Sequence, residues 1–346
     1  MVVGNNKSAV FLKEPSKYPV AGEHIGVELK QLNTDLHDGQ ILLRNLYISL
    51  DPYLRNRMKD VVSYVPSYKT GEPLDSHGIA EVVESKNSKW PVGSLVVGPT
   101  IRWEERSVVG ANAELEIIPA ESLDPRIPLS AHIGVLGMPG YTAYGSLLEI
   151  GKPKAGETIF ISAASGAVGQ LVGQIAKLKG LRVIGSAGSD DKVEYLLKEL
   201  KFDAAFNYKR GSILENLRAA APEGIDIYYE NVGGETLEAV LEVIKAHGRI
   251  IACGMISEYN NGKDTYNVKN LVNIVLKRLK MEGFLVYEFG EVVKKRFERE
   301  VSEWLKNGEI VYREDIAQGL DNAPDAFVGL FHGRNFGKGV VKIADL

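Results

Sequence analysis

The sequence predicts an α/β protein in which a doubly wound parallel sheet is combined with a second, mostly β domain. From Gly151 onward, short apolar strands alternate with segments of helical periodicity. This alternation is typical of a parallel sheet that helices cover on both faces. From about Ser8 to Pro128, by contrast, proline and glycine interrupt short strands every few residues, which indicates a compact domain built mainly of strands.

The expected elements follow in order along the chain. In the mostly β part, strands are expected at 42–48, 79–83 and 94–97. In the α/β part, strands are expected at 158–162, 182–186, 204–208, 225–230 and 249–253, and helices at 168–178, 192–200, 213–221, 236–246 and 291–306. A last strand pattern lies at 337–343. We therefore expect domains at 1–128 and 129–305, and a C-terminal segment, 306–346, that returns to the first domain.

A glycine-containing turn, Ala-Ala-Ser-Gly-Ala-Val-Gly at 163–169, lies where the strand 158–162 should lead into a helix. Glycines at such a junction let the backbone approach a pyrophosphate, and the helix N-terminus offers free N–H groups and the positive end of a dipole. A tight turn without a ligand is the alternative, but the position between strand and helix favours a nucleotide site. The polar residues that lie off the apolar face of this helix are Gln170, Gln174 and Lys177.

The next strand, 182–186, bears on which nucleotide is bound. An enzyme that uses NAD usually places a carboxylate at the tip of this strand, where it holds the ribose 2′-hydroxyl. Here the strand runs into Ser-Ala-Gly-Ser at 186–189, so no carboxylate would repel a 2′-phosphate. Lys192 follows in the first helical turn as a candidate phosphate ligand, although a solvated surface charge is an equal alternative. Asp190 and Asp191 are interpreted as residues that favour the helix start. The pattern favours NADPH over NADH.

Composition is that of an ordinary enzyme. The 346 residues are enough for two domains, and a formal net charge of −4 argues against a nucleic-acid or anionic-membrane binder. The single cysteine, Cys253, excludes intramolecular disulfides and any multi-cysteine zinc site. The N-terminus lacks the apolar core of a signal peptide, and no apolar run approaches membrane-spanning length. We expect a cytoplasmic protein.

Ordered motifs along nearly the whole chain carry a family resemblance. They lie at 49–55 (Ser-Leu-Asp-Pro-Tyr-Leu-Arg), 136–144, 163–169, 186–189, 206–209, 229–234 (Tyr-Glu-Asn-Val-Gly-Gly), 253–260 and 329–335. With these motifs the chain resembles the zinc-independent medium-chain dehydrogenases/reductases, in the branch that contains double-bond, alkenal and prostaglandin reductases. The resemblance implies a Rossmann domain that binds NADPH, a GroES-like first domain and a homodimer.

The resemblance also implies which residues contact the cofactor. Those expected around the pyrophosphate are Ser165, Gly166, Ala167 and Val168. Those expected around the adenosine ribose and its 2′-phosphate are Gly188, Lys192 and Tyr208. Those expected along the rest of the dinucleotide are Pro52, Thr142, Asn231, Cys253, Tyr259, Phe284, Leu285, Val286 and Asn335. Asn231 and Cys253 also fit the rule that ligands lie outside the carboxyl ends of parallel strands, although Cys253 and Val286 would serve equally as core residues.

No metal is expected, although many relatives in the superfamily use zinc. A catalytic zinc needs three protein ligands, usually from Cys, His and carboxylate side chains. His77 stands where zinc-dependent relatives carry a Gly-His-Glu motif, but no glutamate follows it, and Cys253 belongs to the nucleotide-binding half. We therefore interpret His77 as a pocket or turn residue.

Two tyrosines are the candidate catalytic residues. Hydride delivered to the β-carbon of an α,β-unsaturated aldehyde or ketone creates an enolate, and a hydrogen-bond donor aimed at its oxygen lowers the barrier. Tyr259 is expected to polarise that oxygen, and Tyr53 to bind it or stack beside it; packing is an even alternative for Tyr53. A ribose hydroxyl of the cofactor is a further donor.

The sequence thus indicates an NADPH-dependent reductase of the carbon–carbon double bond of enals and enones. A quinone reductase or zinc-free alcohol dehydrogenase on the same fold is the enzymatic alternative, and a non-catalytic NADPH-binding protein is the alternative from another class. The expected homodimer would form through the second domain, near Phe284, Leu285 and Val286 at the end of the sheet.

Overall fold

The computed structural model describes residues 3–262 and 264–346. The chain separates into two compact units: residues 1–134 with 314–346 form unit 1, and residues 135–313 form unit 2. The sequence-based division instead placed its limits after residues 128 and 305. Unit 1 is discontinuous, because the chain leaves it for unit 2 and later returns.

Unit 2 is built on a parallel sheet with the strand order β10-β9-β8-β11-β12-β13. Its strands are β8 (Thr158–Ile161), β9 (Arg182–Ala187), β10 (Ala204–Asn207), β11 (Ile225–Glu230), β12 (Ile244–Ala252) and β13 (Lys280–Gly283). The order reverses between β8 and β11, which is the point where a doubly wound sheet binds its ligands. The predicted Rossmann-type α/β fold is thereby confirmed.

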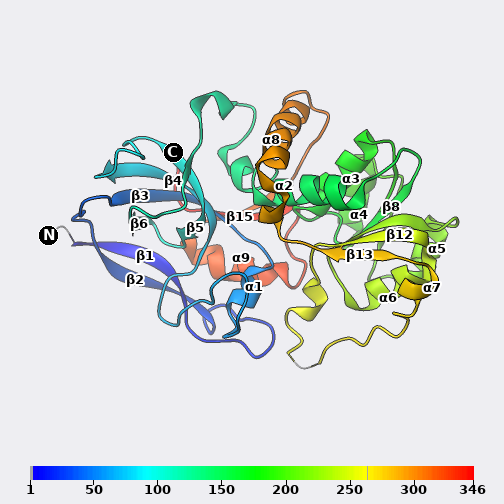
Figure 1. The fold of residues 1–346 in the computed structure, drawn as a ribbon. Coiled ribbons are helices and arrows are strands. Elements are labelled where there is room, and N and C mark those ends of the chain that lie inside the picture. Colours follow the sequence, from blue (N-terminus) through cyan, green and yellow to red (C-terminus); the bar gives the residue numbers. More distant parts are fainter. Residues whose placement is uncertain (1–2, 263) are drawn as a thin grey trace. The chain divides into compact units, whose positions relative to one another are not determined.

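Helices cover both faces of this sheet, with α3 and α4 on one face and α5 and α6 on the other (Figure 1). The helices of unit 2 are α2 (Met138–Gly145), α3 (Gly169–Leu178), α4 (Asp190–Lys198), α5 (Ile213–Ala220), α6 (Gly234–Val243), α7 (Asn273–Leu276) and α8 (Gly290–Lys306). The predicted helix 236–246 is wrong at its end. Ile244 is extended and buried in the core beside Val240 and Leu241, so the chain enters β12 there.

The glutamines of α3 have a structural role that the apolar periodicity did not indicate. Gln170 and Gln174 are buried, at 3% and 6% exposure. The side chain of Gln170 accepts from the N–H of Arg313 (2.9 Å) and donates to its carbonyl (3.2 Å). Gln174 forms the same pair of bonds with Val311 (2.8 and 2.7 Å). Two amide side chains thus hold the segment 311–313 as a neighbouring strand would.

Unit 1 contains a mixed sheet with the order β14-β15-β3-β4-β5-β7, β6 pairing with β3, and a separate β1-β2 hairpin. Its strands are β1 (Val3–Phe11), β2 (Ile25–Asn33), β3 (Ile41–Ser49), β4 (Asp75–Ser85), β5 (Leu95–Arg102), β6 (Arg106–Val109), β7 (Glu116–Ile117), β14 (Glu314–Gln318) and β15 (Lys338–Lys342). The strand pattern at 337–343 forms β15, which pairs antiparallel with β3. The predicted mostly β domain is confirmed.

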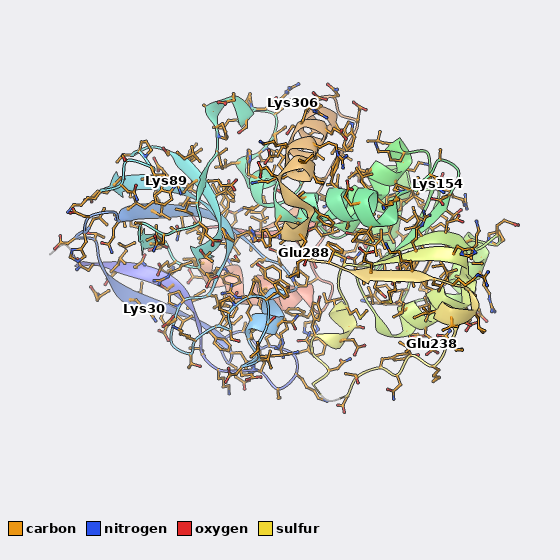
Figure 2. The ribbon with its side chains drawn as sticks, viewed as in Figure 1. Lys30, Lys89, Lys154, Glu238, Glu288 and Lys306 are labelled. Atoms are coloured by element: carbon orange, nitrogen blue, oxygen red, sulfur yellow. The ribbon has the colours of Figure 1, made fainter. Side chains whose placement is uncertain are left out.

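The short helices α1 (Leu54–Arg57) and α9 (Ala323–Leu330) complete unit 1. Trp103 and Phe327 pack edge to face in its core, with ring centroids 5.7 Å apart. Charged side chains such as Lys89 and, in unit 2, Lys154 and Lys306 project into solvent (Figure 2). In the described parts of the chain, no helix has the length and apolar character needed to cross a membrane.

Candidate active site

The turn between β8 and α3 has the form of an anion-binding site. Ala163 has a left-handed backbone (φ 47°), and its carbonyl accepts the N–H of Gly166 at 3.0 Å. A Cβ on Gly169 would lie 2.7 Å from that carbonyl oxygen, so only glycine lets α3 begin this close to the turn. Among residues 3–262 and 264–346, no acceptor is hydrogen-bonded to the N–H groups of Ala167 and Val168. Such N–H groups at a helix start suit a pyrophosphate.

Gly188 and Tyr208 contact each other after the end of β9, and Lys192 follows in the next helix. A Cβ on Gly188 would lie 3.1 Å from the Tyr208 hydroxyl, so the phenol packs against the glycine. Lys192 stands in the first turn of α4 and is only 8% exposed, whereas Tyr208 is 40% exposed. A lysine in the first turn of the helix that follows this strand is a suitable ligand for a 2′-phosphate.

The two aspartates at the start of α4 differ. A hydrogen bond with Ser189 lowers the pKa of Asp191, which fits its interpretation as a residue of the helix start. Asp190 instead pairs with Arg210 and accepts a bond from Asn207 Nδ2 at 2.9 Å. Sequence reasoning missed Arg210, because its pairing depends on β10 lying next to β9.

Asn231, Cys253 and Tyr259 follow the carboxyl ends of β11 and β12. The side chain of Asn231 is held by a bond from Nδ2 to the carbonyl of Ser162 (2.8 Å). The loop after β12 brings the Tyr259 hydroxyl against Gly254, where a Cβ would lie 2.9 Å from it. Burial raises the pKa of the Cys253 thiol to about 11, and the thiol bonds with Tyr229. Cys253 is therefore a neutral side chain at this edge.

The remaining predicted residues of unit 2 lie around the end of β13. Phe284 contacts Phe289 with ring centroids 5.2 Å apart, and the N–H of Leu285 donates to Glu288 Oε2 at 2.9 Å. Val286 begins a short 3₁₀ turn rather than extending the strand. Thr142, in α2, is 7% exposed and donates to the Met138 carbonyl at 2.8 Å.

Unit 1 holds the predicted residues Pro52 and Tyr53 in the bend before α1. Both are half-buried, and Tyr53 packs against the core of this unit. The preceding residue, Asp51, forms a buried ion pair with Lys338 of β15 (2.9 Å), and the same ammonium donates to the carbonyl of Leu50 (2.7 Å). Asp51 and Lys338 are 5% and 2% exposed, so a charge pair fixes this bend.

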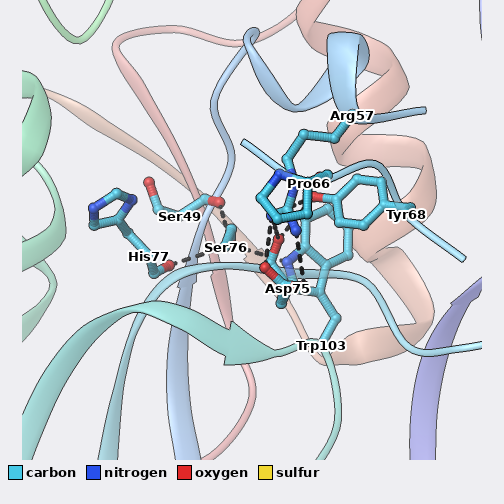
Figure 3. Close-up of polar contacts among 8 residues, drawn as sticks. All are labelled: Ser49, Arg57, Pro66, Tyr68, Asp75, Ser76, His77 and Trp103. Atoms are coloured by element: carbon cyan, nitrogen blue, oxygen red, sulfur yellow. Dashed lines mark hydrogen bonds and ion pairs between the residues drawn. The ribbon is translucent and has the colours of Figure 1, made fainter. Parts of the chain in front are cut away.

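Arg57 fixes the other end of α1, as Figure 3 shows. Its guanidinium holds the Asp75 carboxylate through two bonds (2.6 and 3.0 Å), donates to the carbonyl of Pro66 (3.0 Å) and stacks over the Tyr68 ring at 4.1 Å. Beside it, Ser76 Oγ donates to the Ser49 carbonyl at 2.8 Å. This cluster anchors both ends of the segment between α1 and β4.

Asn335, the last predicted residue, lies before β15. Its Nδ2 donates to the carbonyl of Gly337 at 2.8 Å. It lines a cavity of about 110 Å³ within unit 1, together with Leu50, Asp315, Arg334 and Asp325. Polar side chains therefore surround Asn335, and Leu50, which precedes Asp51, lines the same cavity.

The residues present do not fit a zinc site. In the described part of the chain, no three His, Cys, Asp or Glu side chains come together as a metal would require. His77 is in β4 of unit 1, and burial lowers the pKa of its imidazole, whereas Cys253 belongs to unit 2. We therefore assign no metal chemistry to either residue.

Comparisons with known proteins agree with this arrangement. The family model described as the N-terminal domain of oxidoreductase matches residues 10–118, and the model described as zinc-binding dehydrogenase matches residues 167–307. The chain is 45% identical to the NADP(+)-dependent 2-alkenal reductase of Nicotiana tabacum over 98% of both chains. It is also 45% identical to prostaglandin reductase 1 of Bos taurus, over 97% of this chain and 98% of the other.

A solved structure gives the same answer. CurA of Vibrio vulnificus in complex with NADPH superposes with a TM-score of 0.90 at 37% identity, covering 98% of this chain and all of CurA. Identity at this level along the whole chain shows the family as well as the fold. The chain therefore belongs to the zinc-independent double-bond reductases of the medium-chain dehydrogenase/reductase superfamily.

Proposed function

We propose that this protein reduces the carbon–carbon double bond of α,β-unsaturated aldehydes and ketones with NADPH. The observation that carries the proposal is the 45% identity, over 98% of the chain, to an NADP(+)-dependent 2-alkenal reductase. Two features of the described residues support the same cofactor: the N–H groups of Ala167 and Val168, which have no acceptor and suit a pyrophosphate, and Lys192 in the first turn of α4, which suits a 2′-phosphate.

The expected nucleotide-binding domain, 129–305, carries most of the cofactor contacts in this proposal. The residues that would hold NADPH there are Thr142, Ser165, Gly166, Ala167, Val168, Gly188, Lys192, Tyr208, Asn231, Cys253, Tyr259, Phe284, Leu285 and Val286. Pro52 and Asn335 would contribute from unit 1. Gly169 supports the proposal indirectly, because without a side chain it lets α3 begin close to the turn that carries the N–H groups of Ala167 and Val168.

NADPH, when bound, supplies the hydride that is added to the β-carbon. The role of the protein is to stabilise the charge that develops on the substrate oxygen. In our proposal the Tyr259 hydroxyl donates a hydrogen bond to that oxygen, and Tyr53 binds the oxygen or stacks beside it. A proton from Tyr259 or from water completes the addition of two hydrogen atoms. A neutral phenol suits this task because it donates at pH 7 without carrying a charge.

Product analysis with a panel of an enone, a quinone and a saturated aldehyde tests the proposal. We expect mass spectrometry to find the enone product heavier by two hydrogen atoms, with the carbonyl retained. Reduction of the quinone or the aldehyde alone would instead favour a quinone reductase or a zinc-free alcohol dehydrogenase. Tight NADPH binding without turnover of any compound would favour a binding protein.

We further propose a homodimer formed through the edge strand β13. This strand ends the sheet order of unit 2, and an unpaired edge is suited to pairing with a second copy across a two-fold axis. Apolar side chains just before it support the proposal, since they are 50–74% exposed: Leu271, Val272, Val275 and Leu276.

The cytoplasmic location remains a prediction, which cell fractionation tests.

Sedimentation equilibrium at micromolar concentration tests the dimer. We expect twice the chain mass of 37.9 kDa for the wild type. Val275→Asp should give the single-chain mass, because it places a charge in the proposed interface. Val292→Asp is the matched control, since Val292 is 82% exposed on α8 and should tolerate a charge. A wild-type protein that sediments only at 37.9 kDa would reject the dimer.

A further inference from the structure

Two buried residues join the strand ends that carry the candidate site. Ser162 directly follows β8, and Glu230 is the last residue of β11. Both side chains are 0% exposed. Neither belongs to the residues assigned above to NADPH or substrate, so their polar groups need another explanation.

Ser162 connects Asn231 to the turn between β8 and α3, which we call the pyrophosphate turn because our proposal places the pyrophosphate there. The N–H of Asn231 donates to Ser162 Oγ at 3.0 Å, and Asn231 Nδ2 donates to the Ser162 carbonyl at 2.8 Å. The turn 163–168 begins at the next residue of the chain. Hydrogen bonds thus hold both the backbone and the side chain of Asn231 at the start of that turn.

Glu230 organises the turn that follows Asn231. Its Oε1 accepts the N–H groups of Val232 (2.7 Å) and Gly233 (2.8 Å) and the hydroxyl of Tyr228 (2.6 Å). Gly233 has a left-handed backbone (φ 78°), so the turn is tight. One carboxylate oxygen therefore replaces the backbone acceptors that these two N–H groups lack.

The same turn holds the loop of Tyr259. The N–H of Ile256 donates to the carbonyl of Asn231 at 3.1 Å. The N–H and hydroxyl of Ser257 both donate to the carbonyl of Val232, at 3.0 and 2.6 Å. A Cβ on Gly233 would lie 2.9 Å from Met255 Cβ, so the turn and the loop are in direct contact.

The other carboxylate oxygen of Glu230 makes the arrangement costly. Within the described residues, Glu230 Oε2 has no hydrogen-bond partner. A buried oxygen without a donor destabilises a fold. Oε1 of Glu104 in unit 1 also lacks a partner among the described residues, so the two carboxyls share this cost. What distinguishes Glu230 is that its other oxygen holds the backbone N–H groups of the turn after Asn231.

We propose that Glu230 and Ser162 are positioning residues, which fix the Asn231–Gly234 turn and the Tyr259 loop against the pyrophosphate turn. The inference rests on the proposed function, since it needs NADPH to bind at these turns. Glu230 acts through backbone N–H groups and touches neither substrate nor cofactor in this scheme. Oε1 is the atom that matters, and the charge of the carboxylate is secondary.

Glu230→Ala, Glu230→Gln and Ser162→Ala test the proposal through cofactor titration and steady-state kinetics. Glu230→Ala should raise the dissociation constants of NADPH and NADH by the same factor, about tenfold or more, because the lost bonds do not involve the 2′-phosphate. It should lower kcat at saturating cofactor while leaving KM for the enone within about twofold. Glu230→Gln retains an oxygen that accepts the same N–H groups and should restore both quantities. Ser162→Ala should weaken binding of both cofactors.

Glu104→Ala is the matched control. Glu104 is also a buried carboxyl, 4% exposed, with Oε2 bonded to Asn6 and Ser8 at 3.3 Å, but it lies in unit 1. It should lower the melting temperature without changing the dissociation constants. If Glu230→Ala and Ser162→Ala behave like this control, the positioning role is wrong. Should Glu230→Ala fail to fold, Ser162→Ala decides alone. A wild-type protein that binds no NADPH contradicts the proposed function instead.

Discussion

The two units fix their candidate site residues by different means. In unit 1, two charge pairs surround the bend at Pro52 and Tyr53: a buried pair of Asp51 with Lys338, 287 positions away, and a partly buried pair of Arg57 with Asp75. In unit 2, hydroxyl, amide and backbone groups at neighbouring strand ends hold one another, with Glu230 as the buried carboxyl among them. Removal of one partner of a buried charge pair leaves an uncompensated charge, whereas removal of one member of a hydrogen-bonded network leaves neutral polar groups without a partner.

Lys338→Met removes the cation of the buried charge pair in unit 1 and should have the largest effect. It leaves Asp51 buried without its counter-charge, so we expect a loss of about 3–5 kcal/mol in the free energy of unfolding. Urea or guanidinium unfolding measures it. Lys342→Met, on the same strand, removes an ion pair with the exposed Asp345 and should cost less than about 1 kcal/mol. Equal losses in the two variants would mean that the buried pair does not fix the bend.

Tyr259→Phe probes unit 2 by removing a single hydroxyl while keeping the ring. If this donor acts alone on the substrate oxygen, turnover of enones should fall about 10²–10³-fold, with the melting temperature close to that of the wild type. If Tyr53 shares the charge, the loss is smaller, and the double variant with Tyr53→Phe shows coupling beyond the sum of the single effects. Wild-type turnover in both the single and the double variant would show that the tyrosines only shape the pocket.

Lys192→Ala tests the one cation that our proposal assigns to the cofactor in unit 2. The loss of a charge-assisted bond to the 2′-phosphate should weaken NADPH binding about ten- to a hundredfold. NADH lacks this phosphate, so its dissociation constant should change little. Fluorescence titration with both cofactors measures the difference, and equal losses for both would reject the assignment.

The smallest expected effect is on the pH dependence of stability, to which each unit contributes one buried carboxyl. Burial raises the pKa of Glu230 in unit 2 and of Glu104 in unit 1. The unfolded chain therefore releases these protons first as pH rises, and stability falls from near the unfolded pKa of about 4.3 up to the raised folded value. Glu230→Gln and Glu104→Gln should each remove part of this fall, by about 1.4 kcal/mol for every pKa unit of the shift. Unfolding titrations between about pH 4 and pH 7 measure it, and an unchanged slope would contradict the burial effect.

The sequence predicted the parts of the fold that local patterns encode. The strands from 158 to 252 and the glycine turn lie in contiguous stretches, so periodicity revealed them. Periodicity extended the helix at 236–246 too far, because the burial of Ile244 is a tertiary effect. It also could not show that Gln170 and Gln174 are buried, since their partners lie about 140 residues away.

The candidate site divides in the same way. Gly166, Lys192 and Asn231 were predicted from local motifs and family resemblance, and the structure brings each to a strand end. The charge pair of Lys338 and the bonds of Glu230 could not be inferred, because a lysine in a strand and a glutamate after two tyrosines carry no local signal of burial. In both cases burial depends on which strands lie next to each other, and the neighbouring residues in the sequence do not indicate this.

The position of β15 also has a consequence for synthesis on the ribosome. Unit 2 is contiguous, so all its strands are available once residue 313 has been made. The sheet of unit 1 needs β15, whose residues 338–342 are translated after the whole of unit 2, to cover the end of β3 at 47–49. Domains usually fold from the N-terminus as they emerge, but here the second unit is complete before the first. Until β15 has been made, that stretch of β3 is an open edge, and an open edge is prone to mispairing.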